Sequence, residues 1–150
     1  RNLISFLKKQ KNTNIFFTYP NKDIFAYQIR KTINNFKNKK NFYVFESLGI
    51  LHYFSLVKQM DVVMGNSSSG IIEVPSLNVP VINIGDRQKN RYCSKSVIQC
   101  STNPKDLEKS LKKAYSRSFL SSIKKYKNPY ESKNVHKKII IFLKKNKLIN

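Results

Sequence analysis

Near the middle of this 150-residue chain, a run of small polar residues follows a short apolar segment. The run reads Gly65-Asn-Ser-Ser-Ser-Gly70, and the periodicity after it predicts a helix that begins at about Ser69. The first N–H groups of a helix have no partner within the helix and lie at the positive end of its dipole, so they can bind an anion. The hydroxyls of Ser67, Ser68 and Ser69 would add donors. A diphosphate has the size and charge for such a site.

Glu73 follows about one turn into the same predicted helix. A carboxylate at this place can accept hydrogen bonds from a sugar diol, as acidic residues do for ribose in dinucleotide-binding folds. Phosphate at the helix start and a diol at the acid would together indicate a nucleotide. The alternative is an ordinary capping arrangement, because serine at the N-cap with an acid in the first turn stabilises any helix. This segment alone leaves both interpretations open.

A second polar cluster follows the next apolar segment, in the stretch Pro80-Val-Ile-Asn-Ile-Gly-Asp-Arg-Gln88. Here Gly85 ends the predicted strand and Arg87 comes directly after the turn. An arginine fork at this edge could neutralise a diphosphate or hold a loop against it. The alternative is a surface turn with a hydrated arginine. Two neighbouring strands that both end in polar clusters favour the ligand site.

The elements that must position these residues alternate between strand and helix. Short apolar segments rich in β-branched and aromatic residues predict the strands, and apolar residues at helical spacing predict the helices. Strands are expected at residues 14–19, 41–45, 61–64, 79–84 and 97–99, and helices at 23–38, 50–59, 69–77, 104–115 (with Asn103 as its cap), 118–126 and 131–147. Continuous apolar strands in this order indicate an α/β fold with a Rossmann-like parallel sheet and helices on both faces. Ligands bind such sheets at the carboxyl ends of the strands.

Composition excludes several classes of protein. No stretch approaches the ~20 apolar residues that a membrane span requires, and the N-terminus lacks the apolar core of a secretory signal. A cytoplasmic protein with reduced thiols at Cys93 and Cys100 is therefore expected. Neither these cysteines nor His52 and His136 belong to a cluster with metal-ligand spacing, so no metal and no cofactor is expected.

The chain carries a formal charge of +21, which at first suggests a nucleic-acid binder. The distribution argues against this. Residues 1–40 carry +9 and residues 89–150 carry +14, whereas residues 41–88 carry −2. Only five of the 29 basic residues are arginine, although arginine forks dominate phosphate and base recognition. Lysine-rich solvated faces are the preferred interpretation, and a basic nucleic-acid-binding module is the remote alternative.

Taken together, the two polar clusters resemble the hydrolysing branch of the UDP-N-acetylglucosamine 2-epimerase family. The resemblance rests on residues 65–75 and 80–88 with Arg91, and it extends to Thr18-Tyr-Pro-Asn21, Ser47-Leu-Gly49 and Asn128-Pro-Tyr130. It covers about residues 13–145. It implies a glycosyltransferase-B-like enzyme of two Rossmann-like halves with the active site between them. Residues 1–150 would be its C-terminal nucleotide-sugar-binding domain, and the N-terminal catalytic half would lie outside this sequence.

Carried over by position, the resemblance implies that Ser67 and Ser68 bind the diphosphate and Glu73 the ribose hydroxyls. Arg87 would support the phosphate end. Asn21 would approach the nucleotide or the sugar, and the backbone at Leu48 would hold the uracil.

The family's reaction eliminates UDP from the sugar and hydrates the resulting glycal, which gives N-acetylmannosamine and UDP for synthesis of sialic-acid-type sugars. The acid–base carboxylates lie in the N-terminal half, so this fragment alone is expected to be inactive, and a homo-oligomer is expected. The nearest alternatives are a non-hydrolysing 2-epimerase and the donor-binding half of a glycosyltransferase. The sugar could also be a 2,4-diacetamido-6-deoxy hexose.

Three positions depart from the family pattern. Asn90 stands where the family has glycine, and a turn can survive there because asparagine tolerates positive φ. Glu131 replaces the glycine after Tyr130, which affects how the last helix crosses back to the other half. Residues 22–25 replace small residues and could reshape the sugar end of the pocket.

Overall fold

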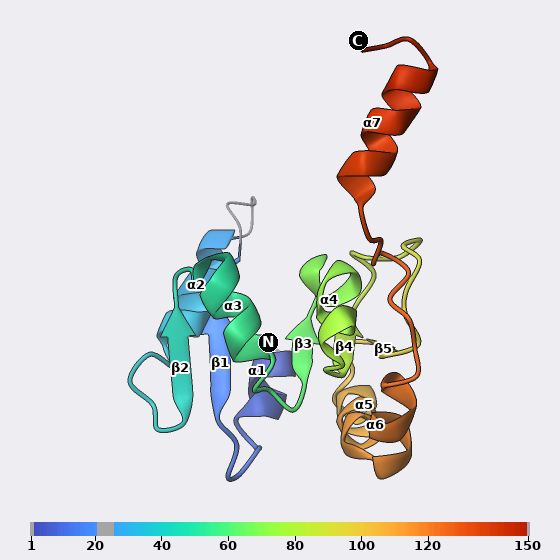
Figure 1. Cartoon of the computed structure of the whole chain (residues 1–150). Coiled ribbons are helices and arrows are strands. Elements are labelled where there is room, and N and C mark those ends of the chain that lie inside the picture. Colours follow the sequence, from blue (N-terminus) through green and yellow to red (C-terminus); the bar gives the residue numbers. More distant parts are fainter. Residues whose placement is uncertain (1, 21–25, 150) are drawn as a thin grey trace.

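The computed structural model describes residues 2–20 and 26–149 (Figure 1). In chain order the elements are α1 (Asn2–Leu7), β1 (Ile15–Thr18), α2 (Ala26–Asn34), β2 (Phe42–Phe45), α3 (Gly49–Val57), β3 (Val63–Gly65), α4 (Ser69–Ile72), the 3-10 helix η1 (Val74–Leu77), β4 (Val81–Ile84), β5 (Val97–Cys100), α5 (Pro104–Tyr115), α6 (Arg117–Ile123) and α7 (Val135–Lys145). Every strand predicted from the sequence is present, with boundaries shifted by one or two residues.

All strand pairs are parallel, which confirms the predicted α/β class. Among the described residues the strands form two sheets, one of β1 and β2 and the other in the order β3-β4-β5. The sequence predicts one continuous sheet, and the structure breaks it between β1 and β3. Apolar patterning identifies a strand locally, but which strands pair depends on hydrogen bonds between distant segments that the pattern does not encode.

β4 is the central strand of the larger sheet and is buried along its whole length. On one face, Ile82 and Ile84 join Leu107, Phe119 and other residues of α1, α5 and α6. On the other face, Val81 packs with Val57, Val74 and Val79. A strand covered on both sides needs a continuous apolar sequence, which is how this segment reads.

Two predicted helices differ from those observed. The helix expected over residues 69–77 divides into α4 and η1. Pro75 has no N–H to donate to the carbonyl four residues earlier, so an α-helix cannot continue through it. The helix expected from residue 131 begins at Val135, because Asn134 has a left-handed backbone (φ +57°). The predicted cap of α5 is confirmed, since the Asn103 side chain accepts from the Lys105 N–H at 2.9 Å.

α7 extends away from the rest of the molecule (Figure 1). None of its residues is buried. Its apolar side chains are exposed at Val135, at Ile139–Phe142 and, just beyond its end, at Leu148 and Ile149. No helix among the described residues is both long enough and apolar enough to span a bilayer.

Leu107 is the side chain through which α5 anchors to the larger sheet, and it is 0% exposed. We expect Leu107→Ala to lower the free energy of unfolding by about 2–5 kcal/mol, because it removes apolar contacts and leaves a cavity. Urea unfolding followed by circular dichroism measures this. Leu51→Ala is the matched control, since Leu51 is 81% exposed, and should change the value by less than about 0.5 kcal/mol. Equal effects of the two substitutions would contradict the described core.

Candidate functional site

The ends of β3 and β4 bring the two polar clusters together. In the parallel register Gly65 lies opposite Asn83, so the serine turn (Asn66–Ser69) and the loop that follows β4 leave the same edge of the sheet. The backbone is left-handed at the end of β4, where Gly85 has φ +76°. A glycine is suited to this position because a side chain there would strain the backbone.

The serine turn presents polar groups to solvent. Ser67 and Ser68 are exposed, and Ser69 is half-buried. Ser68 is the N-cap of α4, but its side chain makes no capping hydrogen bond, and the Ser67 hydroxyl accepts from the Ser69 N–H at 3.3 Å. Within the part of the chain that the structure describes, no hydrogen bond from the backbone N–H of Ser67 or Ser68 is found. The capping alternative therefore accounts for one hydroxyl, and two N–H groups remain for a ligand.

The source of anion attraction differs from the sequence prediction. α4 contains only four residues, so few peptide dipoles are aligned behind the serine turn. An anion here would be held mainly by individual hydroxyl and N–H donors.

α4 packs closely on β4, and this contact fixes the position of the serine turn relative to the sheet. A Cβ atom at Gly70 would lie 3.0 Å from Val81 Cγ1, closer than side-chain packing ordinarily allows. Gly70 is thus needed for contact between helix and strand, rather than for an unusual backbone conformation.

Gln88 joins the two polar loops. Its side chain is buried, and Nε2 donates to the Asn66 carbonyl at 2.9 Å. In the sequence Gln88 is part of a motif, and no role is predicted for it. The sequence does place an amide side chain directly after Arg87, in a loop expected at the same sheet edge as the serine turn. This position is the signal from which a contact between the two loops could be predicted.

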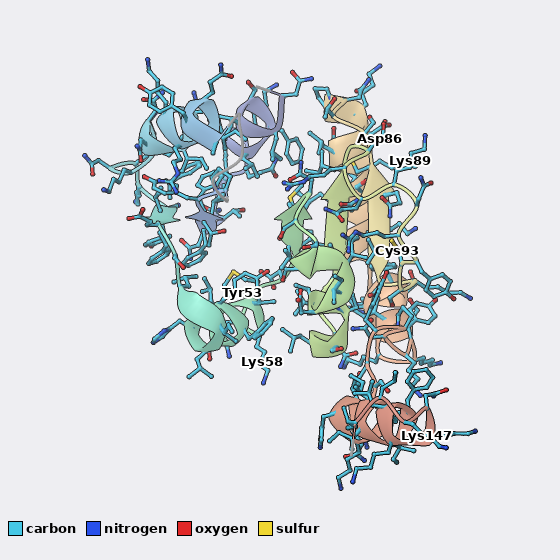
Figure 2. All side chains as sticks on the ribbon, turned by 90° about the horizontal axis from the view of Figure 1, so that it is seen from above. Tyr53, Lys58, Asp86, Lys89, Cys93 and Lys147 are labelled. Atoms are coloured by element: carbon cyan, nitrogen blue, oxygen red, sulfur yellow. The ribbon has the colours of Figure 1, made fainter. Side chains whose placement is uncertain are left out.

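Tyr53 joins α3 to the serine turn (Figure 2). Its hydroxyl lies 3.0 Å from Ser69 Oγ. Leu48 is the half-buried residue before α3, and its carbonyl lies 3.2 Å from His52 Nδ1. His52 therefore has a local structural contact. Tyr53 was missed because its helical position fits an ordinary apolar stripe.

The remaining predicted residues are placed as follows. Glu73 is exposed at the junction of α4 and η1, and its N–H donates to the Ser69 carbonyl at 3.0 Å. Arg87 is exposed, two residues beyond Gly85. Asn21 and residues 22–25 lie outside the described residues. Asn90 has φ +71°, which confirms that the turn survives without glycine.

The cavity lined by α1 and α5 lies apart from this edge. It has a volume of about 710 Å³, and none of the predicted site residues lines it. Among the described residues, no group of three or more histidine, cysteine or acidic side chains could hold a metal ion.

Comparison with known proteins decides the family. The sequence profile of UDP-N-acetylglucosamine 2-epimerases matches residues 1–144. The chain belongs to this epimerase family. The resemblance seen in the sequence is confirmed, and the serine turn and the Arg87 loop can be treated as parts of an epimerase fold.

Curated relatives extend this result. The chain is similar to a protein of Campylobacter jejuni named GDP/UDP-N,N'-diacetylbacillosamine 2-epimerase (hydrolyzing), with 37% identity over 79% of this chain and 31% of the relative. It is also similar to the polysialic acid biosynthesis protein P7 of Escherichia coli, with 35% identity over 88% of this chain and 34% of that protein. The chain thus spans about a third of the length of these relatives.

A solved structure shares the fold. The UDP-GlcNAc 2-epimerase of Methanocaldococcus jannaschii, in complex with UDP-GlcNAc and UDP, superposes with a TM-score of 0.68 at 16% identity. The match covers 95% of this chain and 38% of that structure. At this identity the likeness establishes the Rossmann-like, glycosyltransferase-B-like architecture alone.

The Gln88 contact predicts a local effect. We expect Gln88→Met to remove the donor to Asn66 and to raise hydrogen exchange at residues 66–70 about fivefold, as loss of a hydrogen bond worth about 1 kcal/mol would. Global stability should change little, because Gln88 Oε1 is buried without a partner among the described residues and its removal offsets the loss. Exchange followed by mass spectrometry measures this. Gln59→Met, at an exposed glutamine, is the control. Unchanged exchange in the turn would disprove the bridging role.

Proposed function

We propose that this chain is the UDP-sugar-binding C-terminal domain of a hydrolysing UDP-N-acetylglucosamine 2-epimerase. The observation that carries the proposal is the serine turn, whose N–H groups and hydroxyls lie at one sheet edge with the Arg87 loop and are tied to it by Gln88. The C. jejuni relative, which is named as hydrolyzing, supports the branch. Because relatives are about three times longer, the catalytic half belongs to the remainder of the protein.

The diphosphate is the part of the substrate that this geometry suits best. Ser67 and Ser68 offer backbone N–H groups and exposed hydroxyls. Ser69 Oγ lies beside Tyr53 and can join them at the base of the site. Arg87 adds a guanidinium at the same edge, and a guanidinium pairs with phosphate oxygens through parallel N–H donors.

The nucleoside would lie toward the neighbouring strand ends. In this proposal Glu73 accepts hydrogen bonds from the ribose hydroxyls, and the backbone at Leu48 contacts the uracil. Asn21, just after β1, approaches the nucleotide or the sugar. Leu48 and Tyr53 belong to the same helical segment, so the Tyr53 contact to Ser69 fixes the distance between base and phosphate subsites.

The chemistry then divides between the two halves. Loss of the C2 proton and cleavage of the bond from C1 to the phosphate oxygen release UDP and leave a glycal, and addition of water gives the free 2-epimeric sugar. Negative charge grows on the departing diphosphate, where fixed N–H and hydroxyl donors stabilise it without reorganising. The acid–base carboxylates come from the remainder of the protein.

The remainder of the protein could also cover the exposed apolar face of α7. The helix exposes a run of apolar residues, Ile139–Phe142, which nothing in the described part of the chain covers. We propose that this face packs against the N-terminal half of the same enzyme. Association into homo-oligomers, which the family resemblance implies, is a property of that complete enzyme.

Ligand binding tests the site directly. In calorimetric titration of the full-length enzyme with UDP, we expect Ser68→Ala and Glu73→Gln each to weaken binding about five- to tenfold, because the first removes a hydroxyl donor to the diphosphate and the second removes the negative charge and one acceptor oxygen for the ribose hydroxyls. Ser121→Ala and Glu108→Gln are matched controls on exposed positions of α6 and α5. An absence of heat at millimolar UDP would rule out the proposed site.

Product analysis tests the reaction. With UDP-N-acetylglucosamine, or with the UDP-2,4-diacetamido sugar that the C. jejuni relative's name suggests, the full-length enzyme should release free 2-epimeric sugar and UDP in equal amounts. A non-hydrolysing epimerase would instead interconvert the UDP-sugars without free UDP, and a glycosyltransferase would need an acceptor. Nuclear magnetic resonance of the mixture distinguishes these outcomes.

A further inference from the structure

Asn128 is a buried polar side chain in the segment between α6 and α7, and it is only 3% exposed. Its Nδ2 donates to the Ile72 carbonyl and to Ser76 Oγ, both at 2.7 Å, and its Oδ1 accepts from the Tyr130 N–H at 3.1 Å. The first two contacts reach back more than fifty residues in sequence, to the two sides of Glu73. A buried amide with all of these bonds made is a fixed element of the structure.

The contact to Ile72 replaces a bond that the helix break removes. In a continuous α-helix the Ile72 carbonyl would accept from the Ser76 N–H, four residues on. In this chain the Ser76 N–H donates to the Glu73 carbonyl at 3.0 Å instead, because the backbone tightens into η1. Asn128 Nδ2 supplies the missing donor. The break between α4 and η1 is therefore stabilised from outside the helix.

Ser76 completes the second side of the clamp. Its hydroxyl accepts from Asn128 and donates to Glu131 Oε2 at 3.4 Å. Between the two anchor points, Val74 is fully buried, whereas Glu73 is exposed. Its neighbours on both sides are thus held by Asn128, and Glu73 lies between them with φ −102° and ψ −47°.

We propose that Asn128 is a positioning residue for nucleotide binding, which acts by fixing the α4–η1 break and so the direction of Glu73. This rests on the proposed function, in which Glu73 binds the ribose hydroxyls. Asn128 itself does not touch the ligand. Its loss should therefore weaken recognition of the nucleoside more than recognition of the diphosphate, which depends on the serine turn.

The test compares two inhibitors of the full-length enzyme, UDP and inorganic pyrophosphate. Asn128→Asp keeps the size of the side chain but replaces the donor with an oxygen that faces the Ile72 carbonyl and Ser76 Oγ. We expect the inhibition constant of UDP and the KM of the substrate to rise about tenfold, as loss of charged or polar contacts does. The inhibition constant of pyrophosphate and kcat should change less than twofold.

Coupling to Glu73 separates positioning from general destabilisation. If Asn128 acts through Glu73, the double variant with Glu73→Gln should bind UDP no more than twofold weaker than Glu73→Gln alone. Asn2→Asp is the matched control, because it also removes an amide donor to a backbone carbonyl, that of Thr102 at 3.1 Å, but far along the chain from Glu73. Additive losses in the double variant, or equal losses for UDP and pyrophosphate, would overturn the proposal.

Ser76→Ala provides a milder variant that keeps the contact to Ile72, in case Asn128→Asp does not fold. It should show the same selectivity for UDP over pyrophosphate, with a smaller loss, and unchanged UDP affinity in this variant would count against positioning. If the wild-type enzyme does not bind UDP at all, the proposed function fails first, and this result differs from every outcome above.

Discussion

The parallel pairing of β3 with β4 is the constraint on which the candidate site depends. It places Gly65 opposite Asn83, and from there two loops with different roles leave the sheet at one edge. Because β4 is buried on both faces, its register is held by side chains on two sides at once: Ile82 and Ile84 on one, Val81 on the other. A slip by one residue would exchange these faces and turn Asn83 into the apolar core. The core therefore specifies the site.

Local sequence patterns were sufficient for the strands, for most of the helices and for the meeting of the two polar clusters at one sheet edge. Strand existence, the cap at Asn103 and the left-handed turn at Asn90 could be predicted because each depends on residues within a few positions of one another. The two strand-end clusters could be predicted because parallel strands bring their carboxyl ends together. The pairing gap between β1 and β3 could not, since it depends on contacts between whole segments.

What the sequence did not reveal are the side chains that connect those elements. Gln88, Tyr53 and Asn128 each make their decisive contact with a residue at least sixteen positions away. Gln88 and Asn128 lie in recognisable motifs and Tyr53 in a helical segment, but none of these local patterns identifies the distant partner. Net charge, by contrast, is prominent in the sequence but does not indicate where the ligand would bind. The lysines at both ends dominate the composition, yet the serine turn, Glu73 and Arg87 lie within residues 41–88, which carry −2. At physiological salt the attraction between the lysines and a nucleotide is largely screened beyond about 8 Å, so the lysines can favour encounter but cannot replace the local donors.

α4 explains why these long-range contacts are needed. A helix of four residues is too short to be stable by itself, because its nucleation costs more than its few hydrogen bonds return. Its position must come from outside: Gly70 against Val81 below, Tyr53 at Ser69 on one side, and Asn128 at Ile72 at its end. These anchors come from a strand, from a preceding helix and from the segment after α6. The serine turn and Glu73 occupy the two ends of that short helix, so the same three contacts set the spacing between the proposed phosphate and ribose subsites. A longer helix would hold its own C-terminal end through its hydrogen bonds. In this chain Glu73 still donates its N–H to the Ser69 carbonyl, but the helix breaks directly after it, and tertiary contacts from Asn128 hold that break.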